Sequence, residues 1–229
     1  MADITDPSDY TGEVSPGGEP HRRTAGSLAI TKLAVDPQMS NNCYLLRCTE
    51  TGEQVLIDAA AEGPRLLGLT GDGGLNAVIT THQHWDHHRA LAEVVQATGA
   101  TVIASEPDAD SITEQTGVAV DQRVGEGDRI PVGTCSLAVI PVAGHTPGSI
   151  CLLYDDGSGR PHLFTGDSLF PGGPGRTTNP EDFDSIMDDL QTKIFDPLAD
   201  ETWFYPGHGN DSTLGAQRAS IPEWLARRW

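Results

Sequence analysis

One short stretch of the chain concentrates side chains that bind metal ions. Residues 81–88 read Thr-His-Gln-His-Trp-Asp-His-His and hold His82, His84, Asp86 and His87. Imidazole nitrogen and carboxylate oxygen are the ligands that zinc and related divalent ions prefer. So dense a set is hard to explain by packing. We therefore interpret it as part of a metal site rather than as a solvated loop that happens to be rich in histidine.

Three later residues extend this set. His145, Asp167 and His208 each follow an apolar run and stand directly after a glycine. A single histidine is more often a surface residue or a hydrogen-bonded core residue than a ligand. The same placement three times favours one shared site. The seven ligand-type residues divide naturally into two metal pockets that share Asp167.

The elements that must position these residues are short strands. Residues 77–81 form an apolar run that predicts a buried strand directly before the histidine cluster. Residues 28–33, 43–46 and 54–58 predict earlier strands, with a turn at 50–53. Functional groups on mixed α/β scaffolds tend to lie where a strand ends and a loop begins. The cluster is therefore expected at one edge of a sheet.

The rest of the chain alternates helices and strands. Apolar spacing predicts helices over 89–98 and 106–115, and a third that begins at Pro180 with Asn179 as its cap. His88 and His162 lie outside the ligand pattern and are expected on the surface. Further strands are predicted over residues 101–104, 124–142, 150–154 and 162–165.

The ordered motif His82-x-His84-x-Asp86-His87, with the three later ligands, resembles the metallo-β-lactamase superfamily. Within it, the pattern is most similar to the glyoxalase II (hydroxyacylglutathione hydrolase) branch. The likeness runs from about Leu28 to Arg218. It implies an α/β fold, a four-layer αβ/βα sandwich. It also implies a first ion held by His82, His84 and His145, a second held by Asp86, His87 and His208, and Asp167 as the bridge between them.

The resemblance also gives roles to residues around the ligands. Asp58 ends a predicted strand behind the metal loop and is expected to orient a ligand by a hydrogen bond. Arg176 follows a glycine-rich loop and is a candidate to bind a substrate carboxylate. Glyoxalase II enzymes often carry a tyrosine nearby, where this chain has Thr178.

The function implied is that of a metal-dependent hydrolase that cleaves a thioester. Two divalent ions, with Zn²⁺ favoured and iron the alternative, would share a bridging hydroxide that attacks the acyl carbon. Asp86 and Asp167 are the candidate catalytic carboxylates, able to orient that hydroxide or carry a proton. The expected partner is a small thioester-like molecule.

Three alternatives remain open from the residues alone. A persulfide dioxygenase on the same fold would use one iron held by His82, His145 and Asp167, a facial triad. A β-lactamase or lactonase is a weaker interpretation, since one class of zinc β-lactamases has cysteine where Asp167 stands. A non-catalytic module that keeps a structural metal is the last.

Composition narrows the partners and the compartment. The chain has 229 residues and a net charge of −19, which disfavours nucleic acid because phosphate backbones are repelled. Residues 1–26 are polar and rich in Pro and Gly, and are expected to form a flexible extension before a single domain at 27–229. No signal peptide or membrane span is apparent. The four cysteines lack CxxC spacing and are expected to be reduced, buried thiols of a cytoplasmic protein.

Overall fold

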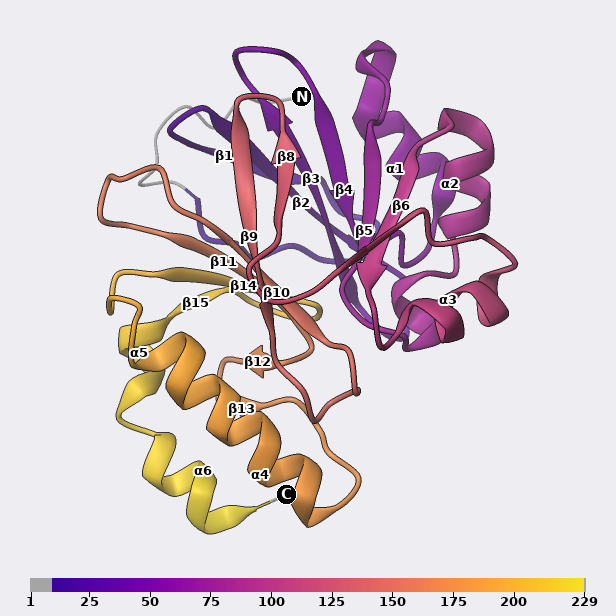
Figure 1. The fold of residues 1–229 in the computed structure, drawn as a ribbon. Helices are drawn as coiled ribbons and strands as arrows, with labels where there is room; N and C mark the ends of the chain where they lie inside the picture. Colours follow the sequence, from indigo (N-terminus) through magenta and orange to yellow (C-terminus); the bar gives the residue numbers. More distant parts are fainter. Residues whose placement is uncertain (1–9, 229) are drawn as a thin grey trace.

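Residues 10–228 are described by the computed structural model, and they form two stacked β-sheets with helices on their outer faces (Figure 1). The larger sheet has seven strands in the order β1-β2-β3-β4-β5-β6-β7. Pairing is antiparallel from β1 to β4 and parallel from β4 to β7. Its strands are β1 (His21–Ala25), β2 (Leu28–Val35), β3 (Asn41–Cys48), β4 (Gln54–Ile57), β5 (Ala77–Thr80), β6 (Thr101–Ser105) and β7 (Gln122–Val124).

The second sheet has six strands in the order β15-β14-β11-β10-β9-β8. Strands β11 and β14 run parallel, and the other pairs are antiparallel. The bounds are β8 (Arg129–Val132), β9 (Cys135–Pro141), β10 (Ile150–Tyr154), β11 (His162–Gly166), β14 (Trp203–Pro206) and β15 (Ser212–Thr213); β12 (Leu169–Phe170) and β13 (Gly173–Pro174) pair separately.

The buried side chains show why the layers stack as they do. Successive residues of a strand point to opposite faces, so Tyr44 and Leu46 of β3 face the core between the sheets, while Cys43 and Leu45 face the helices. One apolar cluster lies between the two sheets, and one lies on the outer face of each. Apolar residues on both faces of a sheet require cover on both sides. The predicted four-layer sandwich is confirmed.

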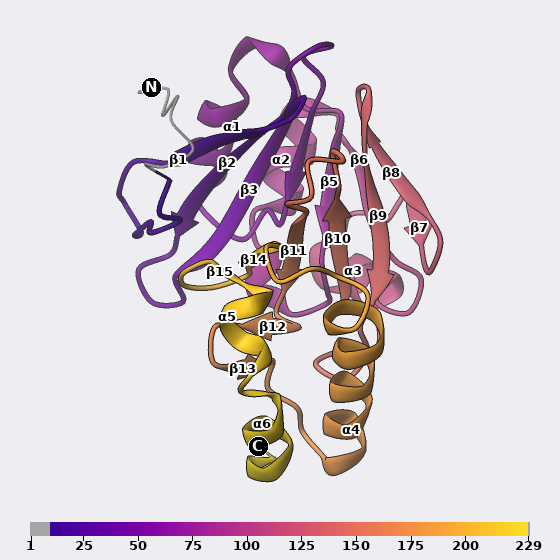
Figure 2. The same cartoon turned by 90° about the vertical axis from the view of Figure 1, so that its left-hand side faces the viewer.

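Two groups of helices provide this cover (Figure 2). Those on the larger sheet are α1 (Gly63–Thr70), α2 (Leu91–Thr98) and α3 (Ala109–Thr116). Those on the smaller sheet are α4 (Pro180–Asp189), which continues as a π-helical segment (Leu190–Phe195), α5 (Leu214–Arg218) and α6 (Ile221–Arg227). The Asn179 side chain accepts a hydrogen bond from the backbone of Asp182 at 2.8 Å, so the predicted cap of α4 is confirmed.

The prediction of a flexible extension is wrong for residues 10–26. Residues 1–9 lie outside the described part of the chain, but Tyr10 is buried and residues 21–25 form strand β1. The Tyr10 hydroxyl donates a hydrogen bond to Asp211, which also accepts one from the buried ammonium group of Lys32. These partners are distant in sequence, so a polar local composition gave no sign of the packing.

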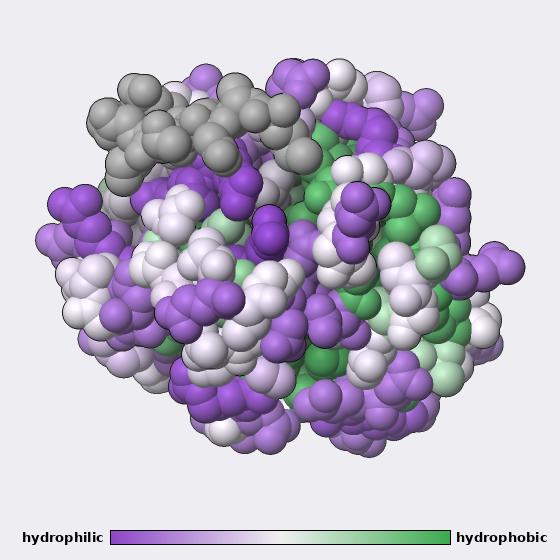
Figure 3. Space-filling view, turned by 90° about the horizontal axis from the view of Figure 1, so that it is seen from above, coloured by the Kyte–Doolittle hydropathy of each residue, from purple (hydrophilic) through white to green (hydrophobic). Residues whose placement is uncertain are grey.

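Figure 3 shows one face of the molecule, seen from above and coloured by residue hydropathy. Hydrophilic residues cover most of the face seen from above in Figure 3, and hydrophobic residues gather toward the side where α1 and α2 lie. Within residues 10–228, no helix combines the length and apolar character that crossing a bilayer requires.

Candidate metal centre

All seven predicted ligands meet at one edge of the two sheets. The larger sheet supplies His82 and His84 from the loop after β5, and Asp86 and His87 from the turn Trp85–His87 that follows. The smaller sheet supplies the others from the loops after three strands. These are His145 after β9, Asp167 after β11 and His208 after β14.

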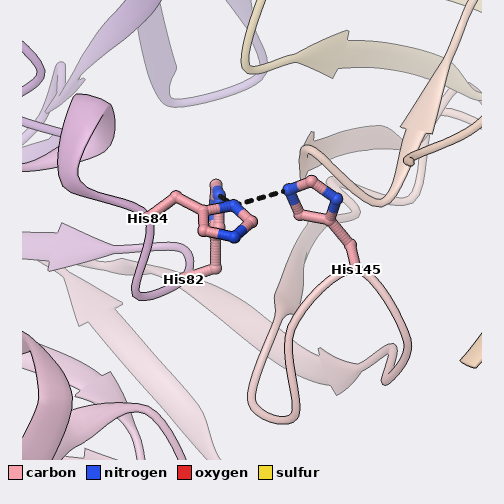
Figure 4. A group of neighbouring side chains, drawn as sticks. All are labelled: His82, His84 and His145. Atoms are coloured by element: carbon pink, nitrogen blue, oxygen red, sulfur yellow. Dashed lines mark hydrogen bonds between the residues drawn. The ribbon is translucent and has the colours of Figure 1, made fainter. Parts of the chain in front are cut away.

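Three imidazoles form the first pocket. His82 and His84 approach from one loop and His145 from the facing loop, with their rings turned toward one another (Figure 4). His84 Nδ1 lies 3.1 Å from His82 Nε2 and 2.9 Å from His145 Nε2. Nitrogen ligands about 2.0–2.1 Å from a tetrahedral ion stand about 3.4 Å apart. Three lone-pair nitrogens at nearly this spacing fit a cation between them.

The second pocket has two imidazoles and one carboxylate. His87 Nε2 lies 3.3 Å from His208 Nε2, and Asp86 Oδ2 lies 3.6 Å from His87 Nε2 and 3.4 Å from His208 Nε2. This spacing again suits ligands around one small divalent ion. Each pocket therefore combines residues from both sheets.

Asp167 lies between the two pockets. Its Oδ2 is 3.7 Å from His145 Nε2 and 3.4 Å from His208 Nε2, and its Oδ1 is 3.3 Å from His87 Nε2. Although Oδ1 is buried, it is without a hydrogen-bond partner among residues 10–228. A buried carboxylate oxygen of this kind needs a compensating positive charge. The donor set thus fits divalent ions.

Hydrogen bonds behind the ligands fix which ring nitrogen faces each pocket. Nδ1 of His87 donates to Asp58 Oδ2 at 2.9 Å. Nδ1 of His145 donates to the carbonyl of Arg176 at 2.8 Å, and Nδ1 of His208 donates to the carbonyl of Met39 at 2.8 Å. A proton held on Nδ1 leaves Nε2 as the free lone pair. Asp58, expected from the sequence to orient a ligand, is thus hydrogen-bonded to one of the candidate ligands.

Electrostatics differ between the pockets. In the first, burial together with the charge of His87 lowers the pKa of His82 well below its ordinary value. Burial and the charge of His145 likewise lower the pKa of His84. These imidazoles stay neutral, which is the state that binds a metal.

The second pocket attracts positive charge. Burial opposes protonation of His87, yet the carboxylates of Asp167 and Asp58 raise the pKa of His87 well above its ordinary value. Burial also opposes protonation of His208, but hydrogen bonds to Asp167 and Asp86 raise its pKa to about 9. A metal ion entering here must displace protons, so its binding is expected to be pH-dependent.

Sequence reasoning missed two buried residues at the site. The carboxylate of Asp108 accepts hydrogen bonds from the backbone of Gln83 at 2.9 Å and from the Thr146 hydroxyl at 2.7 Å, which ties together the loops of the first pocket. The amide of Asn41 lies against Asp86. Asp108 lies inside the predicted helix of residues 106–115, and Asn41 lies outside the predicted strands, so neither position carried a signal.

Two histidines expected on the surface are buried instead. His162 is 4% exposed, and its ring is hydrogen-bonded to the Tyr205 hydroxyl at 2.8 Å inside the core. His88 is 3% exposed and donates to the carbonyl of Gln83 at 3.1 Å. A buried histidine is tolerated where a polar partner is available.

Two exposed side chains lie near the ligands. The side chain of Arg176 is exposed, and its carbonyl holds His145. Trp85, between His84 and Asp86, is 52% exposed and packs against the Arg89 guanidinium, 4.8 Å from the ring centroid.

Comparison with known proteins identifies the family. The sequence model of the Metallo-beta-lactamase superfamily matches residues 36–208, a span that holds all seven candidate ligands. The chain belongs to the metallo-β-lactamase superfamily. The resemblance to the glyoxalase II branch is also confirmed, because hydroxyacylglutathione hydrolases are among its relatives.

Two such relatives differ in length. The hydroxyacylglutathione hydrolase of Polaromonas sp. is 36% identical over 167 residues, covering 72% of this chain and 60% of that protein. Hydroxyacylglutathione hydrolase GloC of Haemophilus influenzae is 30% identical over 203 residues, covering 79% of this chain and 91% of GloC. The chain thus spans little more than half of several relatives, but nearly all of GloC.

Solved structures agree on the fold. ETHE1 from Myxococcus xanthus superposes with a TM-score of 0.72 at 31% identity, covering 84% of this chain and 83% of ETHE1. The B3 metallo-beta-lactamase BLEG-1 superposes with a TM-score of 0.74 at 24% identity, covering 85% of this chain and 98% of BLEG-1, and at that identity supports the fold alone.

Proposed function

We propose that this protein is a dinuclear metal-dependent hydrolase that cleaves thioesters. The observation that carries the proposal is the position of Asp167, whose Oδ2 lies 3.7 Å from His145 Nε2 and 3.4 Å from His208 Nε2. One carboxylate can thereby serve both pockets. In this assignment His82, His84 and His145 hold one ion, Asp86, His87 and His208 hold the other, and Asp167 bridges them.

The chemistry needs no protein nucleophile. A pair of divalent ions, with zinc favoured, supplies a water of lowered pKa and a Lewis acid for the carbonyl oxygen. The chain positions the reactants: Asp86 and Asp167 orient the attacking water and can accept its proton. The other carboxylate oxygen of Asp167 is buried and has no hydrogen-bond partner among residues 10–228, so it is available to accept a hydrogen bond.

A thioester is the favoured substrate because its thiolate leaving group does not need to be protonated by the protein. A thiolate leaves without a general acid, and ions held in both pockets would leave the site with carboxylates and unprotonated imidazoles rather than a neutral acid aimed outward. Hydroxyacylglutathione hydrolases among the relatives support the same class. The side chain of Arg176 is exposed, and its own backbone carbonyl accepts the hydrogen bond from His145. Its guanidinium is the proposed binding group for a carboxylate on the substrate.

The test combines metal content with activity. Elemental analysis of the purified protein should find two zinc ions per chain, and a thiol-reactive dye should detect thiol release from hydroxyacylglutathione and acyl-coenzyme A thioesters. Asp167→Ala should lose both the bridging ligand and more than a hundredfold of the rate. A fully active Asp167→Ala protein would refute the bridged arrangement.

A second candidate uses the same fold with one iron. His82, His145 and Asp167 offer the two imidazoles and one carboxylate of a facial triad, and Asp167 Oδ2 lies 3.7 Å from His145 Nε2. This candidate predicts one iron per chain and oxygen uptake on addition of a persulfide. The three further ligands of the second pocket favour the dinuclear assignment.

A further inference from the structure

Asn41, the first residue of β3, lies beside the second pocket and is fully buried. Its amide Nδ2 donates a hydrogen bond to Asp86 Oδ2 at 3.0 Å and lies 3.4 Å from His208 Nε2. Those two ligand atoms are themselves 3.4 Å apart. The amide therefore packs against both ligands from one side and occupies space that solvent would otherwise fill.

The backbone around Asn41 holds it rigidly in this position. Asn41 forms an isolated antiparallel bridge with His208, and the backbone of Asn42 donates to the carbonyl of Gly207 at 2.7 Å. Two residues earlier, the carbonyl of Met39 receives Nδ1 of His208 at 2.8 Å. Residues 39–42 thus hold the loop of one ligand of the second pocket and contact another directly. Their hydrogen bonds to ligand side chains all go to the second pocket.

We infer that Asn41 is a positioning residue for the second metal pocket, which acts by holding the Asp86 carboxylate toward an ion between Asp86, His87 and His208. The inference rests on the dinuclear site proposed above. The hydrogen bond from Asn41 fixes the orientation of the Asp86 carboxylate, and a buried hydrogen bond to a charged acceptor is stronger than one in water. Partners of this kind change metal affinity by 10- to 100-fold.

The direction of the hydrogen bond distinguishes this role from direct ligation. The Asn41 amide oxygen has no hydrogen-bond partner within residues 10–228, so a half-turn of the amide would bring that oxygen toward the pocket. With the nitrogen inward, Asn41 is a donor to Asp86; with the oxygen inward, it would be a ligand. An aspartate at this position can only accept, so it would repel Asp86 in the first case and bind the ion more tightly in the second.

The experiment titrates metal-free protein with Zn²⁺ against a chromophoric chelator and resolves the dissociation constants of the first and second ions. Asn41→Ala and Asn41→Asp should each weaken the second ion by 10- to 100-fold and leave the first unchanged. Cobalt(II) absorption of the fully loaded variants, titrated to saturation, should show the first-pocket bands unaltered. Gln54→Ala is the matched control, since Gln54 is a buried amide that donates to the carbonyls of Thr70 and Gly74, away from the ligands.

Each result has a distinct meaning. An unchanged second constant in Asn41→Ala overturns the inference, and so does an equal loss of both ions, which is the mark of general destabilisation. Tighter second-ion binding in Asn41→Asp overturns it in favour of ligation by the amide. If the unaltered protein binds only one ion, the proposed dinuclear function is wrong, and so is the proposed role of Asn41. If it binds two ions, the Asn41 variants alone test the role of Asn41.

Discussion

Gly207 packs against Asp167 so closely that a Cβ at position 207 would lie 2.1 Å from Asp167 Oδ1. The same Cβ would lie 2.7 Å from Cε1 of His87. Glycine is thus required before His208 because the ligands of the two sheets converge on its α-carbon. A glycine precedes each of the three later ligands in the sequence, and at Gly207 the reason is steric.

Replacement of Gly207 by alanine should therefore displace the bridging carboxylate. We expect Gly207→Ala to lose bound metal and to reduce hydrolysis by more than a hundredfold, measured by elemental analysis and by thiol release. Gly125→Ala is the control, because a Cβ at Gly125 meets nothing within 4 Å and should leave both quantities unchanged. Normal metal content in Gly207→Ala would contradict the convergence described here.

Asp58 should be needed for its charge. Asp58 has φ of +58°, a backbone conformation that asparagine also tolerates, so Asp58→Asn removes the charge with little backbone strain. The variant should bind the second ion 10- to 100-fold more weakly, because His87 loses its charged acceptor. Zinc titration measures this, with the exposed Asp72→Asn as control. If Asp58→Asn binds the second zinc ion as tightly as Asp72→Asn does, the prediction is wrong and packing alone orients His87.

Asp108 should support the first pocket. Its carboxylate joins the backbone of Gln83, between two ligands, to the hydroxyl of Thr146, beside a third. Asp108→Ala should lower stability by about 1–3 kcal/mol and weaken the first ion more than the second. Thr146→Val removes only one of the two hydrogen bonds, so a smaller change is expected. Urea unfolding and zinc titration provide the values, and a larger loss at the second ion would oppose this assignment.

His162 should make the protein less stable in mild acid. Burial lowers the pKa of His162 to about 4 from an ordinary 6.5. Between these values the unfolded chain binds a proton that the folded protein does not, so stability falls as pH drops from 6.5 toward 4, by up to about 3 kcal/mol. His162→Gln should flatten this part of the stability curve. Chemical unfolding of metal-free protein across that range measures it, and parallel curves for the two proteins would rule it out.

Local sequence patterns predicted the parts of this molecule that local physics determines. The apolar run at 77–81 became β5, and Asn179 capped its helix, because periodicity and capping act within a few residues. The histidine cluster was recognisable because its density has no packing explanation. Its convergence with His145 and His208 followed from the expectation that strand ends share one edge of a sheet.

Several errors arose where partners are far apart in the chain, although the partner of His88 is only five residues away. His162 was expected on the surface because its hydrogen-bond partner, Tyr205, is 43 residues away. Tyr10 is held by Asp211 across 201 residues, and Asn41 contacts His208 across 167. No spacing rule connects such pairs, so their burial becomes apparent only when the strands are placed side by side.

Since each pocket draws ligands from both sheets, neither half of the sandwich carries a complete binding site. A bound ion would then act as a cross-link between the halves, in addition to the apolar core and the hydrogen bonds that join them, such as the one from the Tyr44 hydroxyl to the carbonyl of Pro206. Metal release should therefore allow one sheet to move more freely relative to the other. The stability of the folded protein should then increase with the occupancy of the metal centre.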